Sequence, residues 1–378
     1  MKRKSLFLAA LGILLLNSCD KDLVVQNSVP ATLKIAITGT DVDTRSTVIP
    51  SPTQADENTV NRVTVGLFKS DVGGAVDVIK EYQLSDLTVV NTNTYQASIQ
   101  GSITDSEIGN RDVIVVVNAP AGHFAGLTTK TAFITKALNL TQVKNNLPMS
   151  GVTIAKLVAN QVVGPITVPV SRMVARVDLV SLSSAFDPVG PYANASFTAD
   201  EVFMFNAMTT STLDCLTTQF PGHGWLQDPL PDLPVIYNPN LGDVINKTFI
   251  GSTTYNTMHY FYTFANLFTT NLIVDKINGP FTMATRLVIS GMFKVDKNNT
   301  LDTGTRVYYP VIVNRVLKSA DLTTTKGIGV NRNTIYRISA TIKSIGGTTP
   351  TTIIDPAYLD FNIEVKDWDL TINQNAEF

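Results

Sequence analysis

The sequence predicts an all-β protein made of two β-sandwich domains in tandem, with one or a few short helices. Short runs rich in threonine, valine, isoleucine and aromatic residues recur along the chain and are separated by glycine, proline, asparagine and aspartate. This pattern is typical of an all-β sandwich. Hydrophobic residues make up 44% of the 378 residues. That content is sufficient for a core, and the length indicates two domains.

The first residues have the pattern of an export signal. A basic start is followed by an apolar run from Leu6 to Leu16 and then by "LNSC", which ends at Cys19. The apolar run is too short to cross a bilayer and is typical of a secretory signal. Because "LNSC" resembles the lipobox of bacterial lipoproteins, we expect residues 1–18 to be a lipoprotein signal peptide. Cys19 would then carry fatty acids and anchor the precursor in the outer membrane.

A candidate first strand follows in "ATLKIAIT". Leu33, Ile35 and Ile37 alternate with polar or small residues there, which predicts a strand over residues 32–38. We expect this strand at the edge of a sheet. A sheet that loses an edge strand exposes unpaired amide and carbonyl groups.

The segment after this strand is a candidate cleavage site. It is polar and ends in prolines, which predicts an exposed loop, and exposed loops of small polar residues are preferred sites of proteolysis. Cleavage between Arg45 and Ser46 would release residues 19–45, a lipidated propeptide that contains the first strand. Arg62, just before "VTVGLF", is a second possible site, but cleavage there would leave the product starting directly at a strand.

The later elements are mostly strands. We expect them in "RVTVGLFK" from Arg62, "DVIVVVNA" from Asp112, "MVARVDLVSL" from Met173, "MHYFYTFANLF" from Met258, "RVYYPVIVN" from Arg306 and "TIYRISATIKSIGG" from Thr334. The second of these is apolar on both faces, which predicts a strand covered on both sides. One helix is expected in "TKTAFITKALNLTQVKNN", where Phe133, Ala137, Leu140 and Val143 keep helical spacing.

The glycine and prolines of "QVVGPITVP" indicate a link between domains. We therefore expect an N-terminal domain over residues 46–166 and a C-terminal domain over residues 167–366. The proline-rich run at residues 213–243 has little periodicity. A loop of that length in a compact domain is usually functional or an interaction surface.

The chain ends in a segment of strong β pattern whose phase reverses. The apolar residues fall on odd positions from Leu359 to Val365 and on even positions at Trp368, Leu370 and Ile372. A change of phase turns the apolar face over. We therefore expect the first piece to pair within its own chain. Residues 367–378 would be a donor strand that fills the vacated edge of a neighbouring molecule by β-strand addition, which gives head-to-tail filaments.

The sequence carries no catalytic or metal-binding pattern. His123, His223 and His259 have no ligand at metal-binding spacing, and once Cys19 is lipidated Cys215 is the only thiol left. "DKNNTLDTGT" from Asp296 lacks the glycine and glutamate of a calcium loop. There is no dinucleotide fingerprint and no G-x-S-x-G elbow. We expect no enzyme and no cofactor, and the net charge of −2 with 16% charged residues argues against nucleic acid as a partner.

The chain resembles a fimbrillin of the Bacteroidetes type V pilus, the FimA-like family of major fimbrial subunits. The resemblance covers nearly the whole chain, and the following pieces carry it in order: the lipobox at Cys19, Arg45–Ser46, "RDVIVVVNAP", "NLPMSG", "VSRMVARVDLVSL", "RVYYPVIVNR", "NRNTIYRISATIKSIGG" and "VKDWDLTINQNAEF". It implies two transthyretin-like β-sandwich domains, export as a lipoprotein, cleavage by an Arg-specific protease and assembly with other fimbrial subunits by strand exchange. A chain with both a cleavage site and a donor-like end would be a stalk subunit.

Two alternatives share the fold. A tip or accessory fimbrial adhesin would differ only in its place along the pilus. A surface glycan-binding lipoprotein would use exposed aromatic residues, and Trp225 and Tyr237 in the proline-rich loop are candidates for such a platform.

Overall fold

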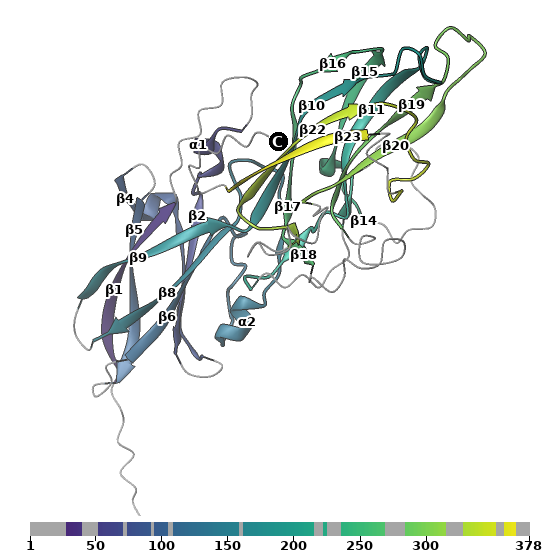
Figure 1. The fold of residues 1–378 in the computed structure, drawn as a ribbon. Coiled ribbons are helices and arrows are strands. Elements are labelled where there is room, and N and C mark those ends of the chain that lie inside the picture. The colour runs from purple at the N-terminus through teal and green to yellow at the C-terminus, as the bar shows by residue number, and fades with distance from the viewer. Residues whose placement is uncertain are drawn as a thin grey trace, which may run out of the picture.

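The computed structural model describes residues 28–39, 52–70, 74–91, 94–104, 109–158, 162–214, 222–224, 236–268, 284–314, 328–352 and 359–367. Its strands form two β-sandwich domains that lie end to end, with the two short α-helices near the junction between them (Figure 1). The prediction of an all-β chain with two sandwiches is confirmed.

The strands of the N-terminal domain pair in one continuous order, β3-β2-β6-β8-β9-β1-β5-β4. The short pairing of β8 with β9 divides this order into two sheets, β3-β2-β6-β8 and β9-β1-β5-β4. Its strands are β1 (Ser28–Gly39), β2 (Arg62–Lys69), β3 (Val76–Gln83), β4 (Thr88–Asn91), β5 (Thr94–Thr104), β6 (Gly109–Val117), β8 (Met149–Leu157) and β9 (Val162–Arg172). Helix α1 (Gln54–Glu57) precedes β2, and a 3-10 turn, η1 (Leu84–Asp86), follows β3.

The two sheets of this domain join at one corner. There β8 pairs with β9 only through Met149–Arg172 and Ser150–Ser171, after which β9 crosses to the other sheet and pairs with β1. Because β9 runs on to Arg172 and the next strand starts at Val174, the change of domain falls at Met173. The division expected after residue 166 lies inside β9.

The C-terminal domain is the second sandwich. Its first sheet has the order β16-β10-β22-β23, with β17 also paired to β10, and its second sheet has the order β15-β11-β19-β20. These strands are β10 (Val174–Ser184), β11 (Ser196–Phe205), β15 (Gly242–Ile250), β16 (Thr254–Tyr255), β17 (His259–Phe264), β19 (Arg286–Lys294), β20 (Thr305–Ile312), β22 (Thr334–Ile342) and β23 (Leu359–Asp367).

Three short pairings and one turn complete the described elements. The paired strands are β7 (Leu138–Asn139) with β12 (Thr210–Ser211), β13 (Gly222–His223) with β14 (Ile236–Tyr237), and β18 (Asn266–Phe268) with β21 (Ile328–Val330). The turn is η2 (Pro239–Leu241).

The expected helix over residues 129–146 is mostly wrong. Only α2 (Lys130–Ile134) is helical, capped by the Thr129 hydroxyl, which accepts a hydrogen bond from the Ala132 amide at 3.1 Å. The chain then turns and Leu138 enters β7, where it is buried. Of the residues with helical spacing, Phe133 lies in α2, whereas Ala137, Leu140 and Val143 lie outside helices and strands.

Each sandwich has its own core, and a third apolar cluster joins the two domains. That cluster packs Phe68 of β2 and Phe133 of α2 with Val174 of β10 and Phe264 of β17. The rings of Phe68 and Phe133 meet edge to face at 5.1 Å between centroids, and Phe124 stacks on Phe133 at 4.1 Å. Because α2 covers the outer face of β2 and β6, these strands are buried on both faces.

Candidate assembly site

The first strand lies inside a sheet and not at its edge. Strand β1 is antiparallel to β5 on one side and parallel to β9 on the other (Figure 1). The expectation of an edge strand is therefore wrong, because β9 returns after its corner and adds a second ladder. Removal of an interior strand leaves two unpaired edges facing one slot, so the demand for a replacement is stronger than the sequence suggested.

The register aligns the predicted apolar positions with apolar neighbours. Positions 33, 35 and 37 of β1 stand opposite Ile99, Ala97 and Tyr95 of β5. Ile99 is fully buried and Ala97 is 4% exposed, and both belong to the N-terminal core. On the other side the same positions stand opposite Val163, Ile166 and Val168 of β9. The slot that β1 fills is thus lined with apolar side chains from both neighbouring strands.

The last described strand, β23 (Leu359–Asp367), pairs within its own chain. Strand β23 pairs antiparallel with β22 from Leu359–Ile342 to Asp367–Thr334 and forms the edge of that sheet. The prediction that Leu359–Val365 pairs within its own chain is confirmed. The strand ends at Asp367, where the apolar phase reverses. Trp368, Leu370 and Ile372 lie outside the described residues.

The expected processing sites also lie outside the described residues: Cys19, Arg45 and Ser46 are not among them. The second candidate, Arg62, is described and opens β2. That strand is paired on both sides, with β3 and with β6, and the Arg62 guanidinium contacts Glu81 at 3.1 Å. Because proteases need an extended, unpaired backbone, cleavage after Arg62 would require the sheet to open.

The chain downstream of the expected cut is anchored by helix α1. The Thr53 hydroxyl accepts from the Asp56 amide at 3.1 Å, and the Asp56 carboxylate accepts from the Thr53 amide at 3.1 Å. This reciprocal pair is a capping box, which satisfies backbone donors at a helix start. Lys144 also binds Asp56, at 2.9 Å. Lys144 and Thr53 hold the pKa of the Asp56 carboxyl below its usual value.

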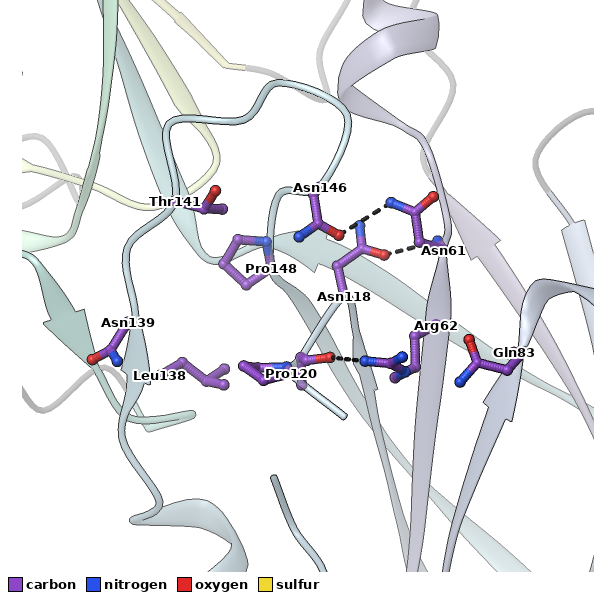
Figure 2. A pocket seen from close by; sticks show the side chains of 11 residues that line it. Asn61, Arg62, Gln83, Asn118, Pro120, Leu138, Asn139, Thr141, Asn146 and Pro148 are labelled. Atoms are coloured by element: carbon purple, nitrogen blue, oxygen red, sulfur yellow. Dashed lines mark hydrogen bonds between the residues drawn. The ribbon is translucent and has the colours of Figure 1, made fainter. Parts of the chain in front are cut away.

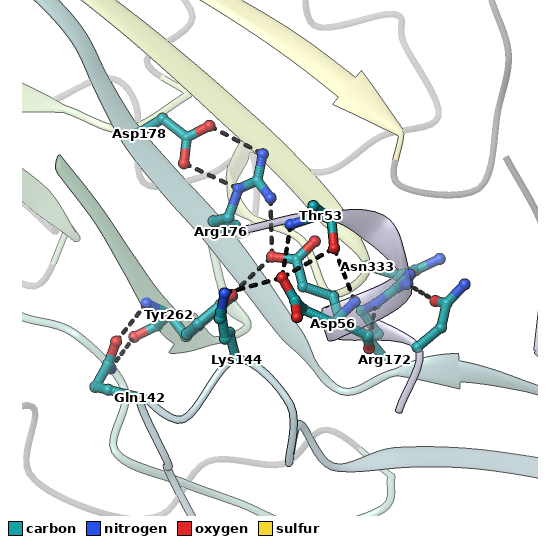
Figure 3. A network of polar contacts seen from close by, with 11 residues as sticks. Thr53, Asp56, Gln142, Lys144, Arg172, Arg176, Asp178, Tyr262 and Asn333 are labelled. Atoms are coloured by element: carbon teal, nitrogen blue, oxygen red, sulfur yellow. Dashed lines mark hydrogen bonds and ion pairs between the residues drawn. The ribbon is translucent and has the colours of Figure 1, made fainter. Parts of the chain in front are cut away.

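Glu57, the last residue of α1, contacts two residues of the C-terminal domain. Figure 3 shows these partners, Arg176 and Tyr262, within the polar network. Its carboxylate is 1% exposed and accepts from Arg176 Nη1 at 2.8 Å and from the Tyr262 hydroxyl at 2.7 Å. Arg176 also binds both oxygens of buried Asp178, at 2.9 and 3.2 Å. Arg172 donates to the Glu57 carbonyl at 3.3 Å. A segment that starts just after the expected cut is thus fixed to both domains.

Burial is the largest single influence on the pKa of Asp178, of Tyr262 and of Arg176. Desolvation raises the pKa of the Asp178 carboxyl although Arg176 opposes the shift. Burial and the nearby Glu57 carboxylate both raise the pKa of the Tyr262 hydroxyl. For Arg176, burial disfavours the charge, but Asp178 and Glu57 outweigh it and raise the pKa of the guanidinium. Arg176 therefore stays charged between its two carboxylate partners.

The residues considered for other chemistry do not form a reaction centre in the described part of the chain. His123 and His259 lie in different domains, His223 is described only by its backbone in β13, and Cys215 lies outside the described residues. The His259 ring binds Asp243 at 2.7 Å and the Tyr255 hydroxyl at 2.9 Å. No cluster of metal-binding side chains occurs among the described residues.

The loop from Asp296 is a series of turns. The side chains of Asp296, Asn299 and Asp302 each accept from a backbone amide two residues further on, at 2.8–3.0 Å. These side-chain oxygens thus close turns, as expected for a polar hairpin loop. Trp225 and Tyr237 were the candidates for a glycan-binding platform. Trp225 lies outside the described residues, and only the backbone of Tyr237 is described, in β14.

A pocket of about 380 Å³ lies near the start of β2 (Figure 2). Its walls carry Asn61, Asn118 and Asn146, whose amides mainly join neighbouring loops. The side-chain nitrogen of Asn118 donates to the carbonyls of Thr59 and Leu147, and its side-chain oxygen accepts from the backbone amide of Asn61. The Asn61 side chain donates to Asn146 at 3.1 Å. These bonds tie the start of β2 to the loop that covers it.

No described helix has the length and apolar character needed to cross a bilayer.

Comparisons with known proteins agree with this architecture. Residues 31–170 match the sequence model of a family described as major fimbrial subunit protein (FimA). Among curated proteins, no sequence matches this chain.

Solved structures of similar fold cover nearly the whole chain. A putative cell adhesion protein from Parabacteroides distasonis ATCC 8503 is 20% identical with a TM-score of 0.62, over 90% of this chain and 99% of that chain. A putative cell adhesion protein from Bacteroides eggerthii DSM 20697 is also 20% identical with a TM-score of 0.62, over 90% of this chain and 96% of that chain. A fimbrilin (FimA) from Porphyromonas gingivalis W83 is 17% identical with a TM-score of 0.58, over 91% and 99%. The resemblance inferred from the sequence is thus confirmed by the match of residues 31–170 to the model of the FimA major fimbrial subunit family.

Proposed function

We propose that this chain is a stalk subunit of a cell-surface fimbria. It is exported as an outer-membrane lipoprotein through Cys19, cut after Arg45 by an Arg-specific protease and polymerised head to tail. In the polymer, residues 368–378 of one subunit replace β1 of the next, while Asp367, which the sequence assigned to the donor strand, pairs with Thr334 in β23. The observation that carries this proposal is the position of β1, which is an interior strand joined to the rest of the chain only through the segment that contains Arg45.

The two segments that would compete for the slot have the same pattern. Leu33, Ile35 and Ile37 repeat at every second position, and so do Trp368, Leu370 and Ile372. Three large side chains contribute about 5–9 kcal/mol when buried, and each backbone hydrogen bond adds about 1 kcal/mol, before ordering costs. A donor strand of this pattern restores much of the stabilising free energy that is lost when β1 is removed.

Cleavage decides which segment occupies the slot. In the uncut chain β1 is covalently linked to its site and so has a high effective concentration, against which a strand from another molecule competes poorly. After cleavage at Arg45 both segments bind as separate molecules. Since donor and acceptor lie at opposite ends of the subunit, each exchange leaves one new donor and the polymer grows as a filament.

The absence of a cut at Arg62 keeps the mature subunit intact. Cleavage there would remove Glu57 and leave Arg176 and Tyr262 without this partner. Cleavage at Arg45 leaves the whole α1 segment in the subunit. The two domains then remain joined after the first strand is released.

Assembly of purified chains tests the proposal. Chains cut by an Arg-specific protease should form a ladder of multimers in mild detergent, whereas an Arg45→Ala variant should stay monomeric. A cut chain that lacks residues 368–378 should also stay monomeric but should still accept a donor from an intact chain. Multimers of equal length with and without residues 368–378 would refute strand exchange.

Lipid attachment is tested separately. Cells grown with labelled palmitate should label the wild-type precursor and not a Cys19→Ala variant. Labelling that survives this substitution would refute the lipoprotein assignment.

A further inference from the structure

The slot that β1 fills has two walls, and they are attached to the molecule very differently. Strand β5 forms one wall and β9 the other. Every residue of β5, from Thr94 to Thr104, stands opposite a residue of β1. On its other side β5 meets only the short strand β4, through Thr94, Tyr95 and Gln96. Without β1, most of β5 would have no ladder partner among the described strands.

What would then remain is a two-stranded hairpin. Hairpins of this kind are marginally stable on their own in water. The side chains of Ala97 and Ile99 pack in the core beneath it. One described hydrogen bond links β5 to the opposite sheet, from the Tyr82 hydroxyl to the Ser98 carbonyl at 2.7 Å.

The β9 wall is fixed at its end. Arg172 and Ser171 pair with β8 at the corner of the sandwich. The Arg332 guanidinium, from the C-terminal domain, donates to the Arg172 carbonyl at 3.1 Å and to the Ser171 carbonyl at 2.9 Å. The next residue, Met173, donates to the Pro148 carbonyl at 2.8 Å. Release of β1 takes away the described ladder partner of most of β9 between Val162 and Val170, but it removes none of these contacts at the end of the strand.

We propose that the β4–β5 hairpin is a movable lid of the strand-exchange slot, and that β9 is its fixed wall. When β1 leaves, the hairpin swings away from β9 and opens the slot sideways. The incoming strand then pairs first along β9, and the hairpin closes over it. A strand that enters from the side does not have to thread between two closed edges. This inference rests on the proposed exchange at the same site.

Hydrogen exchange tests the lid in the full chain. Three states are compared: uncut, cut after Arg45 with the released segment removed, and cut with a synthetic peptide of residues 368–378. We expect the amides of β5 to exchange at least ten-fold faster in the cut state and to regain protection with the peptide. The amides of β2 and β6, and those of β9 next to Arg172, should keep their protection throughout.

A matched pair of substitutions tests the hydrogen bond between Tyr82 and the hairpin. Tyr82→Phe removes the hydrogen bond between the sheets, so peptide uptake by the cut chain should become several-fold faster. Tyr309→Phe is the control, because its hydroxyl also donates to a backbone carbonyl at 2.7 Å, that of Ser344, but in the other domain. This control should leave the uptake rate unchanged.

The outcomes separate the lid from strand exchange itself. Unchanged protection of β5 after cleavage overturns the lid, and so does loss of protection in β2 and β6 at the same rate as in β5. If the cut chain takes up the peptide while the hairpin keeps its protection, strand exchange is supported and the lid is refuted. A hairpin that loosens in a cut chain without peptide uptake supports the lid and refutes the donor role of residues 368–378.

Discussion

Replacement of Arg176 by methionine gives a sharp test of the network between the domains. Arg176 lies between the carboxylates of Glu57 and Asp178, which are 1% and 0% exposed, at 2.8 and 2.9 Å. Removal of one partner from a buried ion pair costs about 3–5 kcal/mol. Because two carboxylates lose the same cation, we expect the upper half of that range at pH 7. Arg337 also lowers the pKa of Asp178, but less than Arg176 does.

The expected loss is large enough for calorimetry. For a domain of this size, 1 kcal/mol corresponds to a shift in Tm of about 2–4 °C, so Arg176→Met should lower the Tm of the C-terminal domain by roughly 8–20 °C. The matched control is Arg306→Met. Arg306 contacts Asp200 at 2.9 Å, and both side chains are 18% exposed. Pairs nearer the surface contribute about 1 kcal/mol or less, so the control should shift the Tm by only a few degrees.

The pH dependence identifies the cause of the loss. In the wild type, burial raises the pKa of the Asp178 carboxyl and Arg176 opposes that shift, so in the variant the folded-state pKa of Asp178 should lie further above its unfolded value of about 4. The folded state then binds more protons than the unfolded state in the interval between these values, and its stability falls as the pH rises through that interval. The deficit relative to wild type should therefore be largest at pH 7 and shrink towards pH 4.

A double substitution provides the rescue. Arg176→Met with Asp178→Leu removes one of the uncompensated charges, so it should be more stable than Arg176→Met alone. The reasoning is refuted if Arg176→Met costs no more than Arg306→Met, or if its deficit is the same at pH 7 and pH 4.

Three further changes have defined outcomes. Phe133→Ala should cost about 3–5 kcal/mol in denaturant unfolding, because a buried ring that contacts Phe68 and Phe124 is lost; a cost below about 1 kcal/mol would show that the cluster between the domains is not tightly packed. Burial and the nearby Lys136 lower the pKa of His123, so the unfolded state takes up a proton at this residue first and the stability should fall as the pH drops below 6.5. His123→Gln should therefore flatten the change in Tm between pH 7.5 and 5.5, and an unchanged slope would contradict this. Gly151→Ala would drive a methyl group into the Pro169 carbonyl at the corner of β8 and β9, so it should cost about 1–3 kcal/mol, whereas Gly122→Ala meets no neighbouring atom and should act only through its backbone strain.

Local periodicity was enough to find most strands. Val63, Val65 and Leu67 alternate in the sequence and are all fully buried in β2, because the side-chain period of a strand is a local property. Helical spacing was misleading at Ala137, Leu140 and Val143, which lie outside the helix α2. Helix α1 was missed, although Thr53 and Asp56 have the spacing of a capping box.

The long-range features could not be predicted from the sequence. Glu57 meets Arg176 and Tyr262 across 119 and 205 residues, and no short motif marks contacts of that range. The interior position of β1 depends on a parallel ladder with β9, whose partners are far away in the sequence. Parallel pairing needs a long connection, so only the folded chain shows that the first strand has two neighbours.

The interior position of β1 bears on why a cut would control assembly. A strand at the edge of a sheet leaves unpaired backbone groups beside it, and such an edge invites pairing with other molecules. In the uncut chain both ladders of β1 are satisfied within one molecule, so this site offers no open edge to a donor. Cleavage within the segment that contains Arg45 would create two facing edges at once. If an uncut Arg45→Ala variant took up the peptide of residues 368–378 as fast as the cut chain, the site would be open before cleavage and the cut would serve another purpose.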